Sequence, residues 1–140
     1  MGKAKLSSGE IAQEFLHGRN CAQCVLGEYA RTLGYDRSET DRIAACFGGG
    51  MGLGQTCGAV TGALMVIGMV WEDKETAAGR AADFCAQFTH RHGSCMCRDL
   101  LGCDLSKPEQ AEQAKAAGQL LQVCPMLVES ALCILDEFFE

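Results

Sequence analysis

One long stretch without charge constrains the fold of this chain most. Residues 46–71 read CFGGGMGLGQTCGAVTGALMVIGMVW, and no charged residue occurs between Arg42 and Glu72. A segment of this composition belongs in a protein interior, where its small residues let backbones approach each other closely. Its uninterrupted apolar part, residues 59–71, is shorter than the roughly 20 residues that a membrane span needs. We therefore predict a buried helix that Thr56 caps, with Cys57 as its first residue, and no membrane span.

Helix-start signals and helical periodicity account for most of the remaining chain. The start signals are Ser7 with Glu10 three residues later, Asn20, Ser94, and Ser106 followed by Pro108. Together with apolar residues at helical spacing, they predict helices near residues 8–17, 20–33, 38–46, 75–88, 94–101, from 106 onward, and 126–139. No run of alternating β-branched residues indicates a strand. The expected fold is all-α, a single domain over residues 1–140 built as a compact bundle of about seven or eight short helices.

Ten cysteines in 140 residues are the second constraint. The N-terminal residues MGKAKLSSGE contain no apolar segment typical of a secretion signal, so we expect a cytoplasmic protein. The cytoplasm keeps thiols reduced, and its cysteine-rich proteins use them for metal, cluster or thiol chemistry. The net charge of −6 and the absence of a long Lys/Arg block argue against nucleic acid as a partner.

Four cysteines are each predicted to lie in the first turn of a helix: Cys21, Cys57, Cys97 and Cys124. For Cys57, at the head of the buried helix, the positive helix end and its unpaired N–H groups are expected to lower the pKa of the thiol. If the four helix starts converge, they present four thiols and a ring of N–H donors to one point. That arrangement suits an iron–sulfur cluster, which is anionic and is held by thiolates. None of the four pairs with another in the C-x-x-C spacing of a zinc ribbon or a thioredoxin site.

Three further cysteines are weaker candidates for the same site: Cys24, Cys46 and Cys95. Cys24 follows Cys21 by one helical turn, so the two could chelate together or form a dithiol pair. Cys46 flanks the glycine-rich segment and Cys95 flanks the predicted helix start, so both could border the site. By contrast, Cys85 and Cys133 lie among apolar residues within predicted helices, and we expect them to pack as small hydrophobic side chains.

Four pieces of the sequence together carry a resemblance to a known family. They are GRNCAQ at residues 18–23, CGAVTGA at 57–63, CRDLLG at 97–102, and Cys124-Pro125. Over about its whole length the chain resembles the C_GCAxxG_C_C family of redox-active proteins, which implies that Cys21, Cys57, Cys97 and Cys124 are the signature thiols. A similar domain occurs in cytochromes that also carry a non-haem iron–sulfur centre, so the resemblance favours a cluster here. The chain has no C-x-x-C-H motif, and haem is not implied.

Three functions remain open from the sequence. The first is an iron–sulfur protein that transfers electrons to or from a redox partner protein, with the four signature cysteines as ligands. The second is a thiol–disulfide oxidoreductase or redox sensor, in which Cys57 attacks and Cys21 or Cys24 resolves. The third, suggested by the resemblance, is a metal- or sulfur-handling module beside a transporter. The broad apolar side of the last helix also allows a homodimer.

Overall fold

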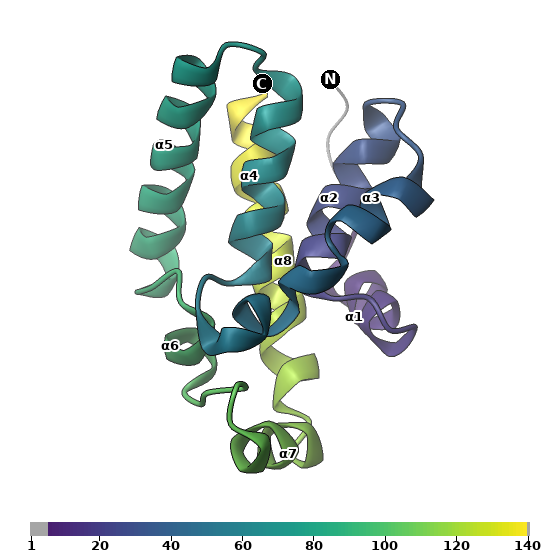
Figure 1. Cartoon of the computed structure of the whole chain (residues 1–140), viewed down its shortest axis with the longest axis vertical. Coiled ribbons are helices and arrows are strands. Elements are labelled where there is room, and N and C mark those ends of the chain that lie inside the picture. The colour runs from purple at the N-terminus through teal and green to yellow at the C-terminus, as the bar shows by residue number, and fades with distance from the viewer. Residues whose placement is uncertain (1–5, 140) are drawn as a thin grey trace.

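The computed structural model describes residues 6–139, and within them the chain folds into helices without a β-strand (Figure 1). This confirms the predicted all-α fold. A short 3-10 turn, η1 (Ala45–Phe47), and a π-type turn, η2 (Gly50–Gly54), precede the fourth of eight α-helices. The helices are α1 (Ser8–Leu16), α2 (Cys21–Thr32), α3 (Arg37–Ile43), α4 (Gly58–Val70), α5 (Lys74–His92), α6 (Cys97–Leu101), α7 (Pro108–Ala116) and α8 (Gln119–Phe138).

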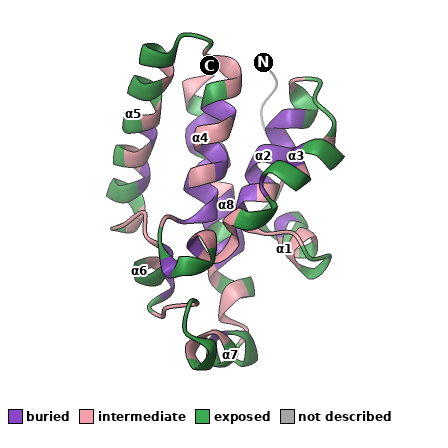
Figure 2. Ribbon diagram, viewed as in Figure 1, coloured by how far each residue is buried: buried purple, intermediate pink, exposed green. Residues whose placement is uncertain are grey.

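Helices α2, α4 and α8 form the centre of the molecule. Figure 2 shows most of the buried residues on these three helices, while α3 and α7 are largely exposed. Helix α5 packs against α4 and α8, and α1 packs against α8. Fully buried side chains from several helices fill the core, among them Val25, Tyr29, Val60, Phe84 and Leu135. The stretch without charge therefore becomes the buried helix α4, as predicted.

Two glycines on α4 allow it to lie directly against the backbone of α2. A Cβ atom on Gly62 would stand 2.9 Å from the carbonyl oxygen of Ala22. On Gly58 it would stand 3.0 Å from both the Ala22 nitrogen and the Cys21 Cβ. Cβ atoms rarely come this close to other atoms, so only glycine fits these positions without moving the helices. The contact places the start of α4, and with it Cys57, beside the start of α2.

The predictions that Thr56 and Ser94 cap helices are wrong, and both fail for the same reason. Residues 55–57 and 95–97 run alongside each other as extended backbone, with Thr56 opposite Met96 in an isolated β-bridge. The Cys57 N–H donates to the Cys95 carbonyl at 2.8 Å, and the Cys97 N–H donates to the Gln55 carbonyl at 2.6 Å. As a result Cys57 itself is the N-cap of α4, and Met96 is the N-cap of α6.

The last helix begins earlier than predicted. Helix α8 starts at Gln119, directly after Gly118, whose φ is +68°, so Cys124 and Pro125 lie inside the helix instead of at its start. Pro125 has no N–H to donate to the carbonyl four residues before it. The first turns are nevertheless held in place, because the Gln119 side-chain amide donates to the Leu101 carbonyl and Leu120 packs against the core.

Three other predicted helix boundaries also differ from the structure. Helix α3 begins one residue earlier, at Arg37, because Asp36 caps it, and it ends at Ile43. Helix α5 continues to His92 and ends at Gly93, which has a φ of +86°. Ser106 does not cap α7, because its hydroxyl donates to the Asp104 carboxylate at 2.6 Å. The predicted caps Ser7 and Asn20 are confirmed, and each forms a complete capping box.

Helix α8 is long and apolar enough to cross a membrane when only its length and composition are considered. In the folded chain, 44% of its apolar window is buried. Core helices of soluble proteins share this length and composition, so α8 gives weak support for a membrane span. Its buried residues, including Leu127, Val128, Leu132 and Leu135, pack into the common core.

A candidate site lined by four cysteines

The four predicted signature cysteines line one cavity. Its volume is about 190 Å³, and Cys21, Cys57, Cys97 and Cys124 all contribute to its wall. The four cysteines are themselves buried. The rest of the wall is mostly apolar, with the glycine backbone at positions 49 and 50 and the side chains of Phe15, Leu100, Leu101, Leu105, Leu120 and Leu127. The structure thus brings together residues that lie far apart in the sequence.

Each cysteine reaches the cavity from a different helix. Cys21 is the first residue of α2, and Cys97 is the first residue of α6, as predicted. Cys57 is the N-cap of α4, one position before the helix. Cys124 comes from within α8, so its predicted place at a helix start is wrong. Fewer helix N-termini therefore surround the cavity than the four that the sequence predicts.

Cys57 and Cys21 interact directly, and their pKa values move apart. A hydrogen bond from the Cys21 thiol lowers the pKa of Cys57, and the backbone N–H groups of Ala59 and Val60 lower it further, against the opposing effect of burial. Hydrogen bonds with Cys124 and Cys57, together with burial, raise the pKa of Cys21 well above its usual value. Cys57 therefore loses its proton more readily than Cys21, in the direction predicted for Cys57, but the Cys21 thiol is a larger cause than the N–H groups of the helix start.

The pKa of Cys97 is affected by the same group of sulfur atoms. Burial raises the pKa of Cys97 to about 12, and the neighbouring Cys57, Cys124 and Cys103 raise it as well. Like charges in a buried space oppose one another, so this arrangement disfavours several thiolates at once. A cationic metal bound by these thiols would have the opposite effect, because it would stabilise their deprotonated form.

The chemistry of the donors decides which group the cavity fits. Thiolates are soft ligands that select zinc, copper(I) and iron–sulfur clusters. Within residues 6–139, no three His, Cys, Asp or Glu side chains are grouped so that they could hold a single metal ion. A single zinc ion needs its sulfur ligands at about 2.3 Å, which demands a tight group of four. The four thiols that line the cavity belong to this soft class of ligand.

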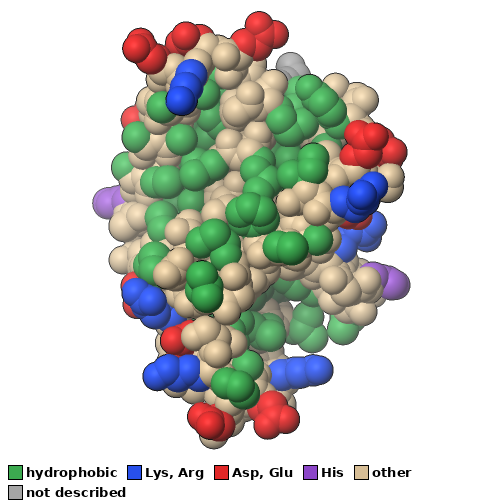
Figure 3. Space-filling view, in the orientation of Figure 1, with side chains coloured by type: hydrophobic (Ala, Val, Ile, Leu, Met, Phe, Trp, Pro, Cys, Tyr) green, Lys and Arg blue, Asp and Glu red, His purple; other side chains and the backbone are tan. Residues whose placement is uncertain are grey.

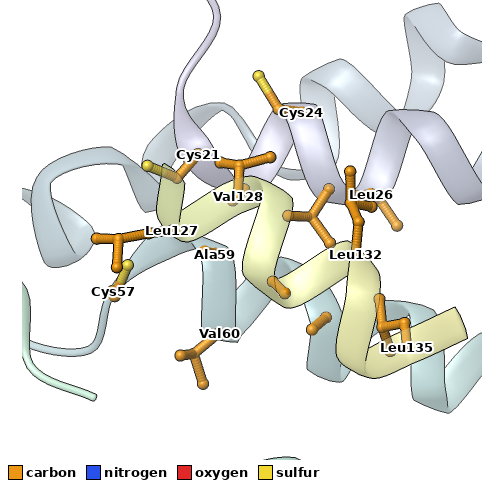
Figure 4. Close-up of a cluster of buried hydrophobic side chains, with 14 of the residues drawn as sticks. Cys21, Cys24, Leu26, Cys57, Ala59, Val60, Leu127, Val128, Leu132 and Leu135 are labelled. Carbon is orange, nitrogen blue, oxygen red and sulfur yellow. The ribbon is translucent and has the colours of Figure 1, made fainter. Parts of the chain in front are cut away.

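Cys24 and Cys46 do not join the four. Cys24 is fully buried, and burial raises its pKa to about 12. In Figure 4 the sulfur atoms of Cys21 and Cys57 lie on the same side of the core near Leu127, whereas the sulfur of Cys24 points away from both. Cys46 lies in η1 and is exposed. Neither residue lines the cavity.

Cys95 borders the site through its backbone only. Its carbonyl accepts the Cys57 N–H, while its sulfur lies outside the cavity, 3.0 Å from the Thr89 hydroxyl. The prediction that Cys133 packs in the core is wrong, because Cys133 is exposed. Cys85 is half-buried, and its surroundings include Cys95.

Sequence reasoning missed two parts of the site. Cys103 follows α6 closely enough to affect Cys97 electrostatically, and its position six residues after Cys97 is the only trace of this in the sequence. The apolar wall was also missed. Phe15, Leu105 and Leu120 come from three separate segments and carry no distinguishing pattern, since any helical protein has leucines at such positions.

Comparison with known proteins agrees with the cysteine geometry. The model of one family, described as "Putative redox-active protein (C_GCAxxG_C_C)", matches residues 19–138, which is most of the chain and includes all four cavity cysteines. No match was found among curated proteins or among solved structures. A family match of this extent leads to one conclusion: the chain belongs to the C_GCAxxG_C_C family.

Proposed function

We propose that this protein holds an iron–sulfur cluster through Cys21, Cys57, Cys97 and Cys124 and exchanges electrons with a redox partner protein. One observation carries the proposal: four thiols from four different helices line a single, largely apolar cavity. Membership of a redox-active family supports a redox role for these thiols.

The residues around the cavity suit such a role. When bound, the cluster would supply a centre that gains and loses an electron. The Ala59 and Val60 N–H groups, which lower the pKa of Cys57, stabilise negative charge on its sulfur. The four cysteines are buried in a mostly apolar wall, and burial and hydrogen bonding of this kind tune a reduction potential. Cys21 and Cys97 must lose their protons on binding, so we expect tighter binding at higher pH.

The first experiment is to purify the protein without oxygen and to measure its absorption spectrum, iron and acid-labile sulfide. We expect brown protein that contains iron and sulfide, and near-complete loss of both in the Cys57→Ser variant. Cys133→Ser is the matched control, because Cys133 is exposed and lies outside the cavity, so this variant should keep its iron. Colourless, iron-free protein with ten free thiols would rule out the cluster.

A second function is favoured by the direct contact between Cys57 and Cys21. In thiol–disulfide exchange, the Cys57 thiolate would attack a substrate disulfide, release one substrate thiolate and form a mixed disulfide. Cys21 would then lose its proton and attack the Cys57 sulfur, which releases the second substrate thiol and leaves a Cys21–Cys57 disulfide. Cys24 does not suit the role of resolving thiol, because its sulfur points away from Cys57. This function predicts colourless protein in which mild oxidation joins Cys21 to Cys57, and purification without oxygen therefore separates the two candidates.

A further inference from the structure

A second pair of cysteines lies outside the cavity, where α5 faces the link between α5 and α6. Cys85 and Thr89 are four residues apart on α5 and therefore lie on the same side of the helix. Cys95, in the link, turns back against this side. Its sulfur lies 3.0 Å from the Thr89 hydroxyl oxygen and 3.6 Å from the Cys85 carbonyl oxygen, so Cys85 and Cys95 are neighbours in the fold.

The pair is partly accessible to small reagents. Cys85 and Cys95 are both half-buried, whereas Cys24 and the cavity cysteines are buried. A disulfide needs the two sulfur atoms at about 2.05 Å, so the two thiols must move closer for the bond to form. The link can supply this movement, because Cys95 lies outside both helices and α5 has already ended at Gly93.

We propose that Cys85 and Cys95 form a reversible disulfide when the protein meets a hydroperoxide. Each thiol loses one proton and one electron, and a sulfur–sulfur bond forms. The peroxide O–O bond breaks, and its two oxygen atoms take up the two electrons and two protons, so that hydrogen peroxide leaves as two water molecules. A thiol reductant reverses the reaction by exchange at the disulfide.

The backbone connects this pair to the four-cysteine site. The Cys95 carbonyl accepts the Cys57 N–H at 2.8 Å, and the Cys97 N–H bonds to Gln55 at 2.6 Å. Closing the disulfide ties Cys95 to α5 and so fixes the backbone that holds both cavity cysteines. The pair is thereby placed to report oxidation to the neighbouring site. Its chemistry uses none of the cavity thiols, so it does not depend on whether a cluster is bound.

The arginines of this region allow a direct test by peptide mapping. Reduced protein is treated with an equimolar amount of hydrogen peroxide, its remaining thiols are alkylated, and it is digested with trypsin without reductant. Cleavage after Arg80, Arg91 and Arg98 gives peptide 81–91, whose only cysteine is Cys85, and peptide 92–98, which contains Cys95 and Cys97. We expect these two peptides to be cross-linked, with Cys97 alkylated, and the cross-link to disappear after treatment with dithiothreitol.

Two variants locate the bond. Cys95→Ser should abolish the cross-link between the two peptides, and Cys97→Ser should keep it. The count of free thiols should fall by two on oxidation in the unmodified chain and in Cys133→Ser, which removes an exposed cysteine elsewhere. A cross-link that persists in Cys95→Ser would assign the bond to Cys97 and overturn the proposal. So would full alkylation of both Cys85 and Cys95 after oxidation in protein whose circular dichroism is still helical.

Discussion

At the scale of single residues, Cys57 and Cys21 behave as one titrating unit. The hydrogen bond that lowers the pKa of Cys57 also contributes to raising that of Cys21. The first proton to leave the pair therefore comes from Cys57, and the second leaves at a much higher pH. Because of this asymmetry, a thiolate is more stable at Cys57 than at Cys21.

The contribution of Cys21 can be measured in protein free of bound metal. Removing the thiol in Cys21→Ala takes away the largest cause of the lowered pKa at Cys57. A hydrogen bond to a thiolate stabilises the charged form, so we expect the Cys57 titration to move to higher pH in this variant. The ultraviolet absorbance of thiolate, followed against pH, measures this shift. Cys133→Ala is the control, and an unchanged titration in Cys21→Ala would show that Cys21 does not stabilise the thiolate.

These two pKa shifts also determine how the contribution of each thiol to folding stability depends on pH. The pKa of Cys57 is lower in the folded than in the unfolded chain, so its contribution is present above the unfolded value of about 8.5 and is lost as the pH falls through the folded value. The raised pKa of Cys21 acts in the opposite direction. Its contribution is present below about 8.5 and is lost as the pH rises towards its folded pKa.

At the scale of helices, the contact between α2 and α4 builds the site. Gly58 and Gly62 let the two backbones touch, and this contact brings Cys57 against Cys21. A side chain at either position would push the helices apart, and the cavity would change shape with them. The glycines of α4 thus serve the site, although neither supplies a functional group.

Two glycines on the same helix provide a matched test of this contact. Gly62→Ala forces a Cβ against the Ala22 backbone, and we expect it to lower the free energy of unfolding by about 1–3 kcal/mol. Gly68→Ala meets nothing within 4 Å, so the better helix propensity of alanine should raise it by about 0.5–1 kcal/mol. Urea denaturation measures both values. Equal stability of the two variants would show that α2 and α4 do not need a glycine contact.

The helix boundaries also show what the sequence could and could not predict. Ser7 and Asn20 cap as expected, since each forms its capping box with a residue three positions later. Thr56 fails because its backbone pairs with a segment 40 residues away, and no local pattern contains that information. Ser106 fails because Asp104 offers a closer partner. A local capping signal therefore predicts a helix start correctly where no other contact competes for the capping residue.

The same limit applies to the site. The four cysteines were predicted together, and they do line one cavity. The reasoning for Cys124 was nonetheless wrong, since Pro125 lies inside α8 and not at its first turn. The contact of the Cys95 sulfur with Cys85 could not be predicted either, because it depends on how the α5–α6 link folds back after Gly93. Tertiary packing decides such contacts.

At the scale of the whole molecule, charge and apolar surface are separated. Figure 3 shows charged side chains at both ends and along the edges of this face, with hydrophobic and uncharged side chains across its middle. The apolar side of α8, which suggested a homodimer, is largely taken up by the core, so the homodimer stays a prediction without support from that helix. The redox partner protein and the absence of nucleic acid likewise stay predictions.

Because the cavity is assembled from four helices, a group bound there should stabilise the entire fold. A ligand present at a hundred times its dissociation constant adds about 2.7 kcal/mol, which for a domain of this size corresponds to a rise on the order of 10 °C in the melting temperature. We expect calorimetry of loaded and metal-stripped protein to show such a difference. Cys57→Ser should melt at one temperature in both preparations, and equal melting temperatures in the unmodified chain would contradict binding in the cavity.

The wide spacing of the cavity cysteines also has a consequence for how the chain folds. Residue 124 meets residue 21 only after α8 has docked, so the complete cavity cannot exist in any early, locally folded intermediate. Until that step, ten thiols are carried on a partly folded chain in which wrong pairs can form as easily as right ones. Refolding should therefore succeed only in the presence of a reductant, and any metal must enter at or after the docking of the last helix.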